Sequence, residues 1–252
     1  MRRPSRYPVL LHGFMESSGS WGERVIDGLT GARLTPVLVD LPGHGRNSGS
    51  GDPPIITLDD ALATVAAAGD WPTDLAGYSM GGRIALHFAA AYPGRVSRLV
   101  LESASPGLAT VEEGAARRAA DEELASTLLR DGIEAFVDRW EAQPLFESRS
   151  ALDRAELARQ RELRRRNDPA SLAAALRGLG TGALPSLWER LPEISTPTLL
   201  LVGALDRKFV EIAERMAGVM ADARVIRVEG AGHTVHLECP EAWMDAVTDF
   251  LR

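Results

Sequence analysis

Residues 77–81 (GYSMG) limit the folds open to this chain more than any other segment, because two glycines there flank a central serine. The pentapeptide follows an apolar run at 74–76 and precedes a helical pattern at 83–92. A tight strand-to-helix turn needs glycines beside the central residue and presents its hydroxyl next to backbone amides at the start of the helix. The pattern therefore predicts that Ser79 is a reactive serine; a glycine-rich turn with an incidental serine is the alternative.

Short apolar runs alternate with longer helical patterns over most of the chain. The runs lie at 8–11, 36–39, 74–76, 98–101, 198–202 and 224–228, and helical patterns lie at 83–92, 211–220 and 240–251. The runs lack the polar–apolar alternation of half-exposed strands, which is typical of strands buried on both faces of a parallel sheet. We therefore predict an α/β fold with a doubly wound, mostly parallel sheet.

The region 105–191 interrupts this alternation, because it contains helical patterns without a convincing strand. These patterns lie at 112–129, 133–140, 151–165 and 169–178. We predict a core of residues 1–104 and 192–252, with 105–191 inserted as a helical cap. The basic stretch at 159–166 is expected to be a solvated helix face. The glycines at 178–182 neither follow a strand nor open a helix, which argues against a dinucleotide-binding loop.

Two further polar residues lie just beyond predicted strands. Asp206 follows the run at 198–202 and His233 follows the run at 224–228, so the chain order is Ser, Asp, His. Open α/β sheets build their sites at these strand ends. The HGF motif after the first run predicts an oxyanion hole formed by the backbone amides of Phe14 and Met80. This combination resembles the α/β-hydrolase fold.

Other chemistry-bearing residues have alternative interpretations. Glu102 ends a predicted strand and is the alternative acidic partner of the histidine. His236 forms no metal cluster with other ligands and is predicted to pack near the site, whereas His44 and His87 are predicted to be structural. Cys239 is the single cysteine, so the chain forms no internal disulfide, and a small apolar role is favoured over a catalytic thiol.

Composition excludes several classes of function. Hydrophobic residues make up 45% and charged residues 25% of the chain, which is typical of a soluble globular protein. The net charge of −7 argues against nucleic acid as a partner. No apolar stretch has the length of a membrane span, and the first apolar run is too short for a signal-peptide core. We expect a cytoplasmic protein with no metal and no obligatory protein partner.

Several longer motifs point to one group within this fold. They are HGFMES, YSMGGRIAL, ESASPGL, WEAQPLF, RGLGTGALPSLW, DRKF and GAGHTVHLE. On these motifs the chain resembles the MenH family, the 2-succinyl-6-hydroxy-2,4-cyclohexadiene-1-carboxylate synthases of menaquinone biosynthesis. The resemblance implies a cofactor-independent lyase that eliminates pyruvate from 2-succinyl-5-enolpyruvyl-6-hydroxy-3-cyclohexene-1-carboxylate, a small anionic polycarboxylate. It also implies that the serine acts as a base.

Arginines are the expected ligands of such a substrate. Arg83 lies four positions after Ser79 on the predicted helix, so the two share a face and the guanidinium can hold a carboxylate through two hydrogen bonds. The resemblance adds substrate contacts from Arg117, Arg164, Tyr78 and Trp140. Because Arg118 and Arg165 are adjacent to these two arginines, the sequence leaves open which member of each pair contacts the substrate. The alternative is that these arginines face solvent on their helices and bind no substrate.

Two competing functions remain open at this point. A serine hydrolase that cleaves a carbon–carbon or ester bond of an anionic small molecule would use the same residues, with Ser79 forming a covalent intermediate. The second alternative is a non-catalytic binding protein, which the complete set of site residues disfavours. The number of arginines in the pocket separates lyase from hydrolase. The first run also starts near residue 8, where this fold usually has an additional hairpin, so the strand number is open.

Overall fold

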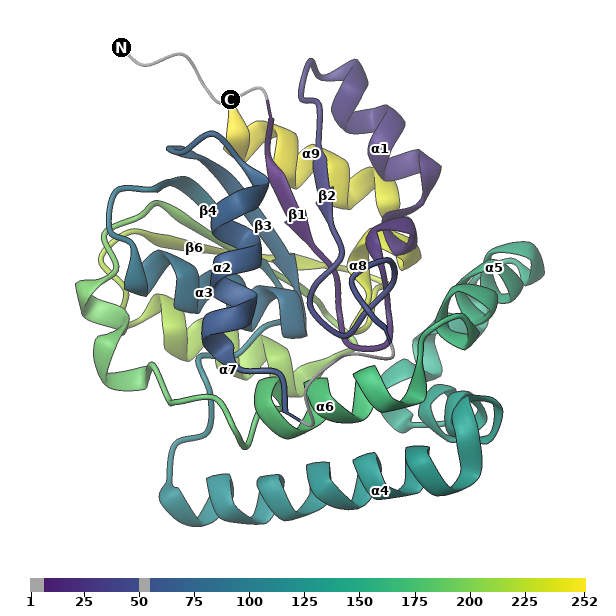
Figure 1. The fold of residues 1–252 in the computed structure, drawn as a ribbon. Helices are drawn as coiled ribbons and strands as arrows, with labels where there is room; N and C mark the ends of the chain where they lie inside the picture. The colour runs from purple at the N-terminus through teal and green to yellow at the C-terminus, as the bar shows by residue number, and fades with distance from the viewer. Residues whose placement is uncertain (1–6, 50–54) are drawn as a thin grey trace.

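A computed structural model describes residues 7–49 and 55–252 of the chain. In this part, six strands form one sheet in the order β2-β1-β3-β4-β5-β6, and each neighbouring pair is parallel (Figure 1). The strands are β1 (Val9–Leu11), β2 (Val37–Val39), β3 (Thr73–Tyr78), β4 (Val96–Glu102), β5 (Thr198–Gly203) and β6 (Ala223–Val228). The predicted parallel α/β sheet is confirmed. Whether a hairpin precedes β1 falls outside the described residues.

Helices cover both faces of this sheet. On one face lie α1 (Gly22–Gly31) and α9 (Pro240–Leu251), and on the other lie α2 (Leu58–Ala68), α3 (Met80–Ala91) and α7 (Arg207–Ala217). Successive strand residues supply opposite cores, as alternation along a strand requires. In β5, Leu199 and Leu201 pack with α9, whereas Leu200 and Val202 pack with α3 and α7. Each buried leucine contributes about 1.5–3 kcal/mol to folding.

The segment between β4 and β5 is helical. It contains α4 (Val111–Glu141), η2 (Pro144–Ala151), α5 (Arg154–Arg165), α6 (Pro169–Leu179) and η3 (Trp188–Glu193), and the short η1 (Ser18–Trp21) and α8 (Val235–Glu238) lie elsewhere in the chain. Figure 1 shows α4 and α6 across one end of the sheet. Residues of α4 and α6 line the same cavity as Ser79, so these helices cover the carboxyl ends of the strands.

Helix boundaries differ from the predicted patterns where caps intervene. The patterns at 112–129 and 133–140 correspond to the two helical parts of α4, which are separated at Gly132, where φ is 78° and ψ is 173°. Helix α5 starts at Arg154 rather than 151, because the Asp153 side chain accepts a hydrogen bond from the Glu156 amide and caps the helix. The residues just before it form η2 instead.

Candidate active site

The turn from β3 to α3 has a strained backbone at Ser79. Its φ is 51° and its ψ is −109°, a conformation that costs non-glycine residues about 1–3 kcal/mol. The Ser79 amide donates a 2.9 Å hydrogen bond to the Glu102 carbonyl, which ties the turn to β4. A Cβ on Gly81 would lie 2.3 Å from the Leu11 carbonyl oxygen, so only glycine allows α3 to approach β1 this closely. The serine hydroxyl is thereby held at the carboxyl edge of the sheet.

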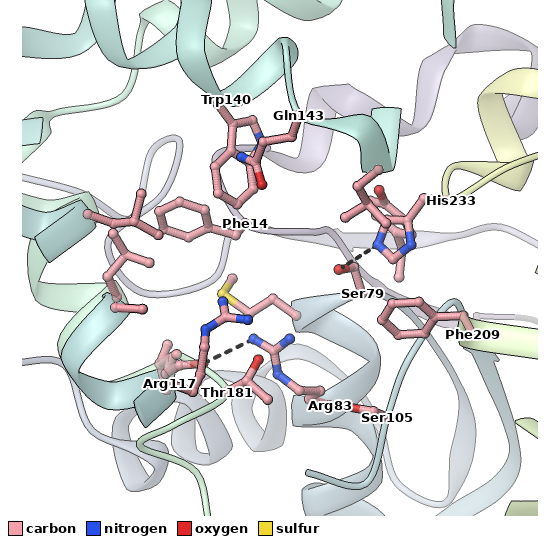
Figure 2. A pocket seen from close by; sticks show the side chains of 18 of the residues that line it. Phe14, Ser79, Arg83, Ser105, Arg117, Trp140, Gln143, Thr181, Phe209 and His233 are labelled. Atoms are coloured by element: carbon pink, nitrogen blue, oxygen red, sulfur yellow. Dashed lines mark hydrogen bonds between the residues drawn. The ribbon is translucent and has the colours of Figure 1, made fainter. Parts of the chain in front are cut away.

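Ser79, His233 and Asp206 form one hydrogen-bonded chain. Nε2 of His233 lies 3.1 Å from Oγ of Ser79, and Nδ1 of His233 lies 2.7 Å from Oδ2 of Asp206 (Figure 2). The imidazole is buried, with 2% of its side chain exposed. This arrangement orients the imidazole so that Nε2 can accept the serine proton. The structure thus brings together the three residues expected from their positions after β3, β5 and β6.

Asp206 also starts a helix. Its other oxygen, Oδ1, accepts a 3.4 Å hydrogen bond from the Phe209 amide at the N-terminus of α7. This cap explains why α7 begins at Arg207, whereas the sequence pattern placed the helix at 211–220. The ring of Phe209 then packs against His233, with ring centroids 4.7 Å apart. The position of Asp206 is therefore held by both the histidine and the helix.

The alternative acid, Glu102, has other partners. Its Oε1 lies 2.8 Å from Nδ1 of His236, and its Oε2 accepts a 2.8 Å hydrogen bond from Nε1 of Trp243. Both members of the Glu102–His236 pair are buried. His236 also packs against the Tyr78 ring at 5.0 Å, consistent with the predicted packing role beside the site.

The other histidines are also buried. Nδ1 of His44 donates to the Pro42 carbonyl at 3.0 Å, and burial together with His12 lowers the pKa of His44 to about 3. Burial lowers the pKa of His87 to about 4, with additional repulsion from Arg83. Both imidazoles are therefore neutral at pH 7 and lie in packed surroundings.

The two amides expected for the oxyanion hole belong to residues at the same cavity. Met80 is the first residue of α3, and Phe14 lies in the loop after β1. His12 fixes that loop, because its Nε2 accepts a 3.0 Å hydrogen bond from the Leu41 amide and its Nδ1 donates to the Gly13 carbonyl at 2.7 Å. The Phe14 ring contacts Trp140 of α4 at 5.2 Å between centroids.

A cavity of about 380 Å³ opens above Ser79. Its polar side chains include Ser79, His233, Arg83 and Arg117, and Figure 2 shows these groups facing a common space beneath Trp140 and Gln143. Apolar residues of α4 and α6 form much of the remaining wall. An enclosed space with a few convergent polar groups is typical of a small-molecule site.

Two arginines supply positive charge to this cavity. Nη2 of Arg83 donates to the Leu179 carbonyl at 3.2 Å, while its Nε is buried without a hydrogen-bond partner among the described residues. Burial, together with the charge of Arg117, lowers the pKa of Arg83 to about 10, although Asp121 opposes the shift. Nε of Arg117 donates to Oδ1 of Asp121 at 2.8 Å. The neighbouring Arg118 is exposed and does not line this cavity.

The third expected arginine, Arg164, lies elsewhere. Its side chain is 4% exposed and pairs with Glu141 at 2.9 Å and with Glu16 at 3.4 Å. It lines a neighbouring cavity behind Phe146 rather than the one that contains Ser79. The packing of α5 against the loop after β1 directs Arg164 toward these carboxylates, so this arrangement does not offer it as a ligand beside Ser79.

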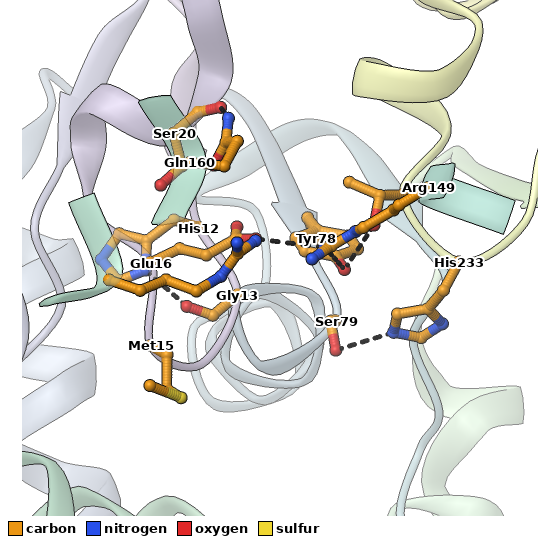
Figure 3. A network of polar contacts seen from close by, with 12 residues as sticks. His12, Gly13, Met15, Glu16, Ser20, Tyr78, Ser79, Arg149, Gln160 and His233 are labelled. Carbon is orange, nitrogen blue, oxygen red and sulfur yellow. Dashed lines mark hydrogen bonds and ion pairs between the residues drawn. The ribbon is translucent and has the colours of Figure 1, made fainter. Parts of the chain in front are cut away.

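Arg149 and Glu16 were not anticipated from the sequence. Nη2 of Arg149 donates to the Tyr78 hydroxyl at 3.2 Å and pairs with Oε1 of Glu16 at 3.4 Å, while its Nε donates to Thr234 at 2.8 Å. Figure 3 shows this network next to Ser79 and His233. Burial opposes the charge of Glu16, but Arg149 and Arg164 together hold its pKa below the ordinary value. The ring of Tyr78 lines the cavity, while its hydroxyl points into this network.

Other candidate chemistries find little support in the residues that the structure describes. No group of three or more His, Cys, Asp or Glu side chains there is arranged to hold a metal ion. No helix there is long and apolar enough to span a membrane. Cys239 is a free, partly buried thiol, and burial raises its pKa, which disfavours the reactive thiolate.

Comparison with known proteins identifies the class. A model of the alpha/beta hydrolase family matches residues 9–246, and the chain belongs to this family. A thermophilic esterase from Thermogutta terrifontis shares the fold, with a TM-score of 0.79 and 25% identity over 99% of this chain and 90% of that one. The scaffold is therefore common to enzymes of different specificity.

More similar proteins define the family within this class. A Bacillus subtilis protein provisionally named 2-succinyl-6-hydroxy-2,4-cyclohexadiene-1-carboxylate synthase is 41% identical over 96% of this chain and 89% of its own length. The synthase of Salmonella paratyphi C is 33% identical over 97% of this chain and 93% of its own. The structure of MenH from S. aureus has a TM-score of 0.90 and 35% identity, covering 99% of this chain and 94% of that one. The chain belongs to the family of 2-succinyl-6-hydroxy-2,4-cyclohexadiene-1-carboxylate synthases.

Proposed function

We propose that this protein eliminates pyruvate from 2-succinyl-5-enolpyruvyl-6-hydroxy-3-cyclohexene-1-carboxylate in menaquinone biosynthesis, giving 2-succinyl-6-hydroxy-2,4-cyclohexadiene-1-carboxylate. The observation that carries the proposal is the placement of Arg83 and Arg117 in the cavity that contains Ser79. A substrate with several carboxylates needs fixed cations, whereas a small neutral ester does not. The family membership supports the same reaction.

Proton abstraction starts from the hydrogen-bonded chain of Ser79. Asp206 stabilises the imidazolium that forms when His233 takes the serine proton. The serine oxygen then removes a proton from C2 of the substrate ring, the C3–C4 double bond is replaced by double bonds at C2–C3 and C4–C5, and the bond between C5 and the enolpyruvyl oxygen breaks. The released enolpyruvate takes up a proton and becomes pyruvate. This reaction needs no cofactor, because the leaving group carries away the electrons of the broken carbon–oxygen bond.

Electrostatic stabilisation comes from groups around the serine. The amides of Phe14 and Met80 are the proposed donors to the negative charge that develops on the substrate during proton removal. Arg83 is half-buried at the cavity wall and its Nε has no hydrogen-bond partner among the described residues, so its guanidinium can offer a carboxylate a charged hydrogen bond that solvent screens only in part. Arg117 keeps its guanidinium at the cavity wall through Asp121. Tyr78 and Trp140 form part of the cavity wall.

The test is direct. The purified protein is incubated with the enolpyruvyl substrate, and pyruvate release and diene absorbance are recorded together. Stoichiometric appearance of both products supports the proposal. Absence of both products, in a preparation whose Ser79 reacts with an active-site-directed organophosphate, would reject it.

A serine hydrolase is the second candidate, because the 3.1 Å contact between Ser79 and His233 also suits nucleophilic attack on an ester. The two functions differ in the fate of the serine. Rapid-quench mass spectrometry during turnover detects an acylated Ser79 in the hydrolase reaction and an unmodified Ser79 in the elimination.

A further inference from the structure

Lys208 is the single lysine of this chain, in which lysine and arginine together number 28. It is the second residue of α7, two positions after Asp206, and its side chain lines the cavity above Ser79. Neither the sequence motifs nor the proposed mechanism gives it a role. An amine at this position lies within the range of a substrate in the cavity.

The ammonium group of Lys208 has no acidic partner in the part of the chain that the structure describes. The ammonium lies over the Phe209 ring, whose centroid is 5.7 Å from Nζ. In contrast, Arg117 is paired with Asp121 at 2.8 Å. An exposed and unneutralised cation is available to a ligand carboxylate, and binding such a ligand breaks no existing ion pair.

The cations of the cavity lie on different sides of Ser79. Figure 2 shows Ser79 between Arg117 on one side and Phe209, with His233, on the other. Lys208 belongs to the second side, because Nζ lies near the Phe209 ring and this ring packs against His233 at 4.7 Å. Arg83 is half-buried and its Nε is enclosed, whereas Lys208 is exposed to solvent. A ligand with separated carboxylates can therefore contact a half-buried and an exposed cation at once.

The two kinds of cation suit two different tasks. Arginine holds a carboxylate through a planar, bidentate contact, whereas the lysine ammonium is a compact charge on a flexible stem. A group that stays on the ring is best held by the first, and a group that departs to solvent by the second. We propose that Lys208 binds the carboxylate of the enolpyruvyl group and of the departing pyruvate, while Arg83 and Arg117 hold the carboxylates that remain on the product. This inference rests on the proposed elimination reaction.

Mutation separates this role from a structural one. Lys208→Gln is expected to lower kcat/KM for the enolpyruvyl substrate by roughly ten- to hundredfold, the range of one lost charged hydrogen bond, and to weaken inhibition by added pyruvate by about tenfold. Lys208→Arg should recover part of both, because it restores the charge. Arg207→Gln is the matched control, since Arg207 is the exposed neighbour and does not line the cavity. Equal behaviour of K208Q and R207Q, or an equal loss of K208Q activity on a neutral nitrophenyl ester, would overturn the proposal.

A second measurement does not depend on turnover. An amine-selective acetylating reagent has only Lys208 and the N-terminal amine to modify in this chain. Pyruvate is expected to slow acetylation of Lys208 at least threefold relative to the N-terminus, as measured by peptide mass spectrometry, while the neutral analogue pyruvamide has no effect. Failure of pyruvate to protect would reject the Lys208 site. Protection without pyruvate release from the substrate would instead retain the site and reject the proposed reaction.

Discussion

Glu102 and His236 form a buried pair in which Oε1 of the carboxylate lies 2.8 Å from Nδ1 of the imidazole. This pair lies beside, and is separate from, the contact between Asp206 and His233. The two histidines lie three residues apart, since His233 lies just before α8 and His236 lies within it. The Glu102 carboxylate also accepts a hydrogen bond from the indole N–H of Trp243, which ties the end of β4 to α9. The geometry therefore assigns different tasks to the two carboxylates.

Substitution of the two acids provides the first prediction. Asp206→Asn is expected to lower kcat by about 10³–10⁴, because the amide no longer stabilises the imidazolium or fixes its tautomer. Glu102→Gln should lower kcat less than tenfold, because Glu102 contacts His236 of α8 and Trp243 of α9 and not His233. Steady-state kinetics on both variants, with circular dichroism to check folding, makes the comparison. A larger loss in Glu102→Gln would show that the wrong acid has been assigned.

Removal of the serine hydroxyl gives the second prediction. Ser79→Ala is expected to reduce kcat by at least a factor of about 10³ while changing KM little, since the hydroxyl acts in the transition state and contributes little to ground-state binding. Pyruvate release measured over a range of substrate concentrations separates the two constants. A large rise in KM at unchanged kcat would contradict a role for Ser79 as the base.

Arg83 gives the third prediction. Arg83→Ala is expected to lower kcat/KM for the anionic substrate by about one to two powers of ten, because one charged hydrogen bond in a buried site is worth about 1.5–3 kcal/mol. The variant should hydrolyse or bind a neutral nitrophenyl ester nearly as well as the parent protein. Arg118→Ala is the control, since Arg118 is exposed outside the cavity. Equal losses on both substrates would mean that Arg83 supports the turn structurally.

A buried acid in β3 gives the fourth prediction. Burial raises the pKa of Asp74 to about 6 although Arg98 opposes the shift, and neither carboxylate oxygen has a hydrogen-bond partner among the described residues. Between about pH 4 and 6 the folded state therefore retains a proton that the unfolded state has lost, so stability falls as pH rises through this window. Asp74→Asn should remove this decline and raise the free energy of unfolding at pH 8 by about 2 kcal/mol.

Urea unfolding at pH 5 and pH 8 tests this expectation. The difference between the asparagine variant and the parent protein should be larger at pH 8 than at pH 5. Asp70→Asn serves as the control, because Asp70 is exposed just before the same strand. A pH-independent difference would mean that Asp74 is ionised in the folded protein throughout this range.

The strands and the position of Ser79 were accessible from the sequence because they depend on local patterns. The predicted run at 198–202 is the strand β5 (Thr198–Gly203), and the pattern at 240–251 is α9. The glycines around Ser79 indicate a tight turn wherever they occur between a strand and a helix. The roles assigned to Ser79, His233 and Asp206 remain predictions, although the hydrogen bonds between them have the expected order.

The contacts of the inserted helices were decided only by tertiary packing. Arg149 and Glu16 are separated by 133 residues, and no local pattern relates them. The sequence does not distinguish Arg164 from Arg117, because each is followed by another arginine on a charged helix. The docking of α5 against the loop after β1 directs Arg164 to Glu16, whereas α4 presents Arg117 to the cavity.

The sequence by itself determined the succession of strands and helices along the chain, the strained turn at Ser79 and the family to which the chain belongs. The tertiary structure decided which acid reaches His233, which arginines face the cavity, and that Lys208 lies at its exposed side. The physical reason is the sequence distance over which each kind of interaction acts. Backbone conformation responds to neighbours within a few residues, whereas the partner of a charged side chain depends on elements that meet only after the chain has folded.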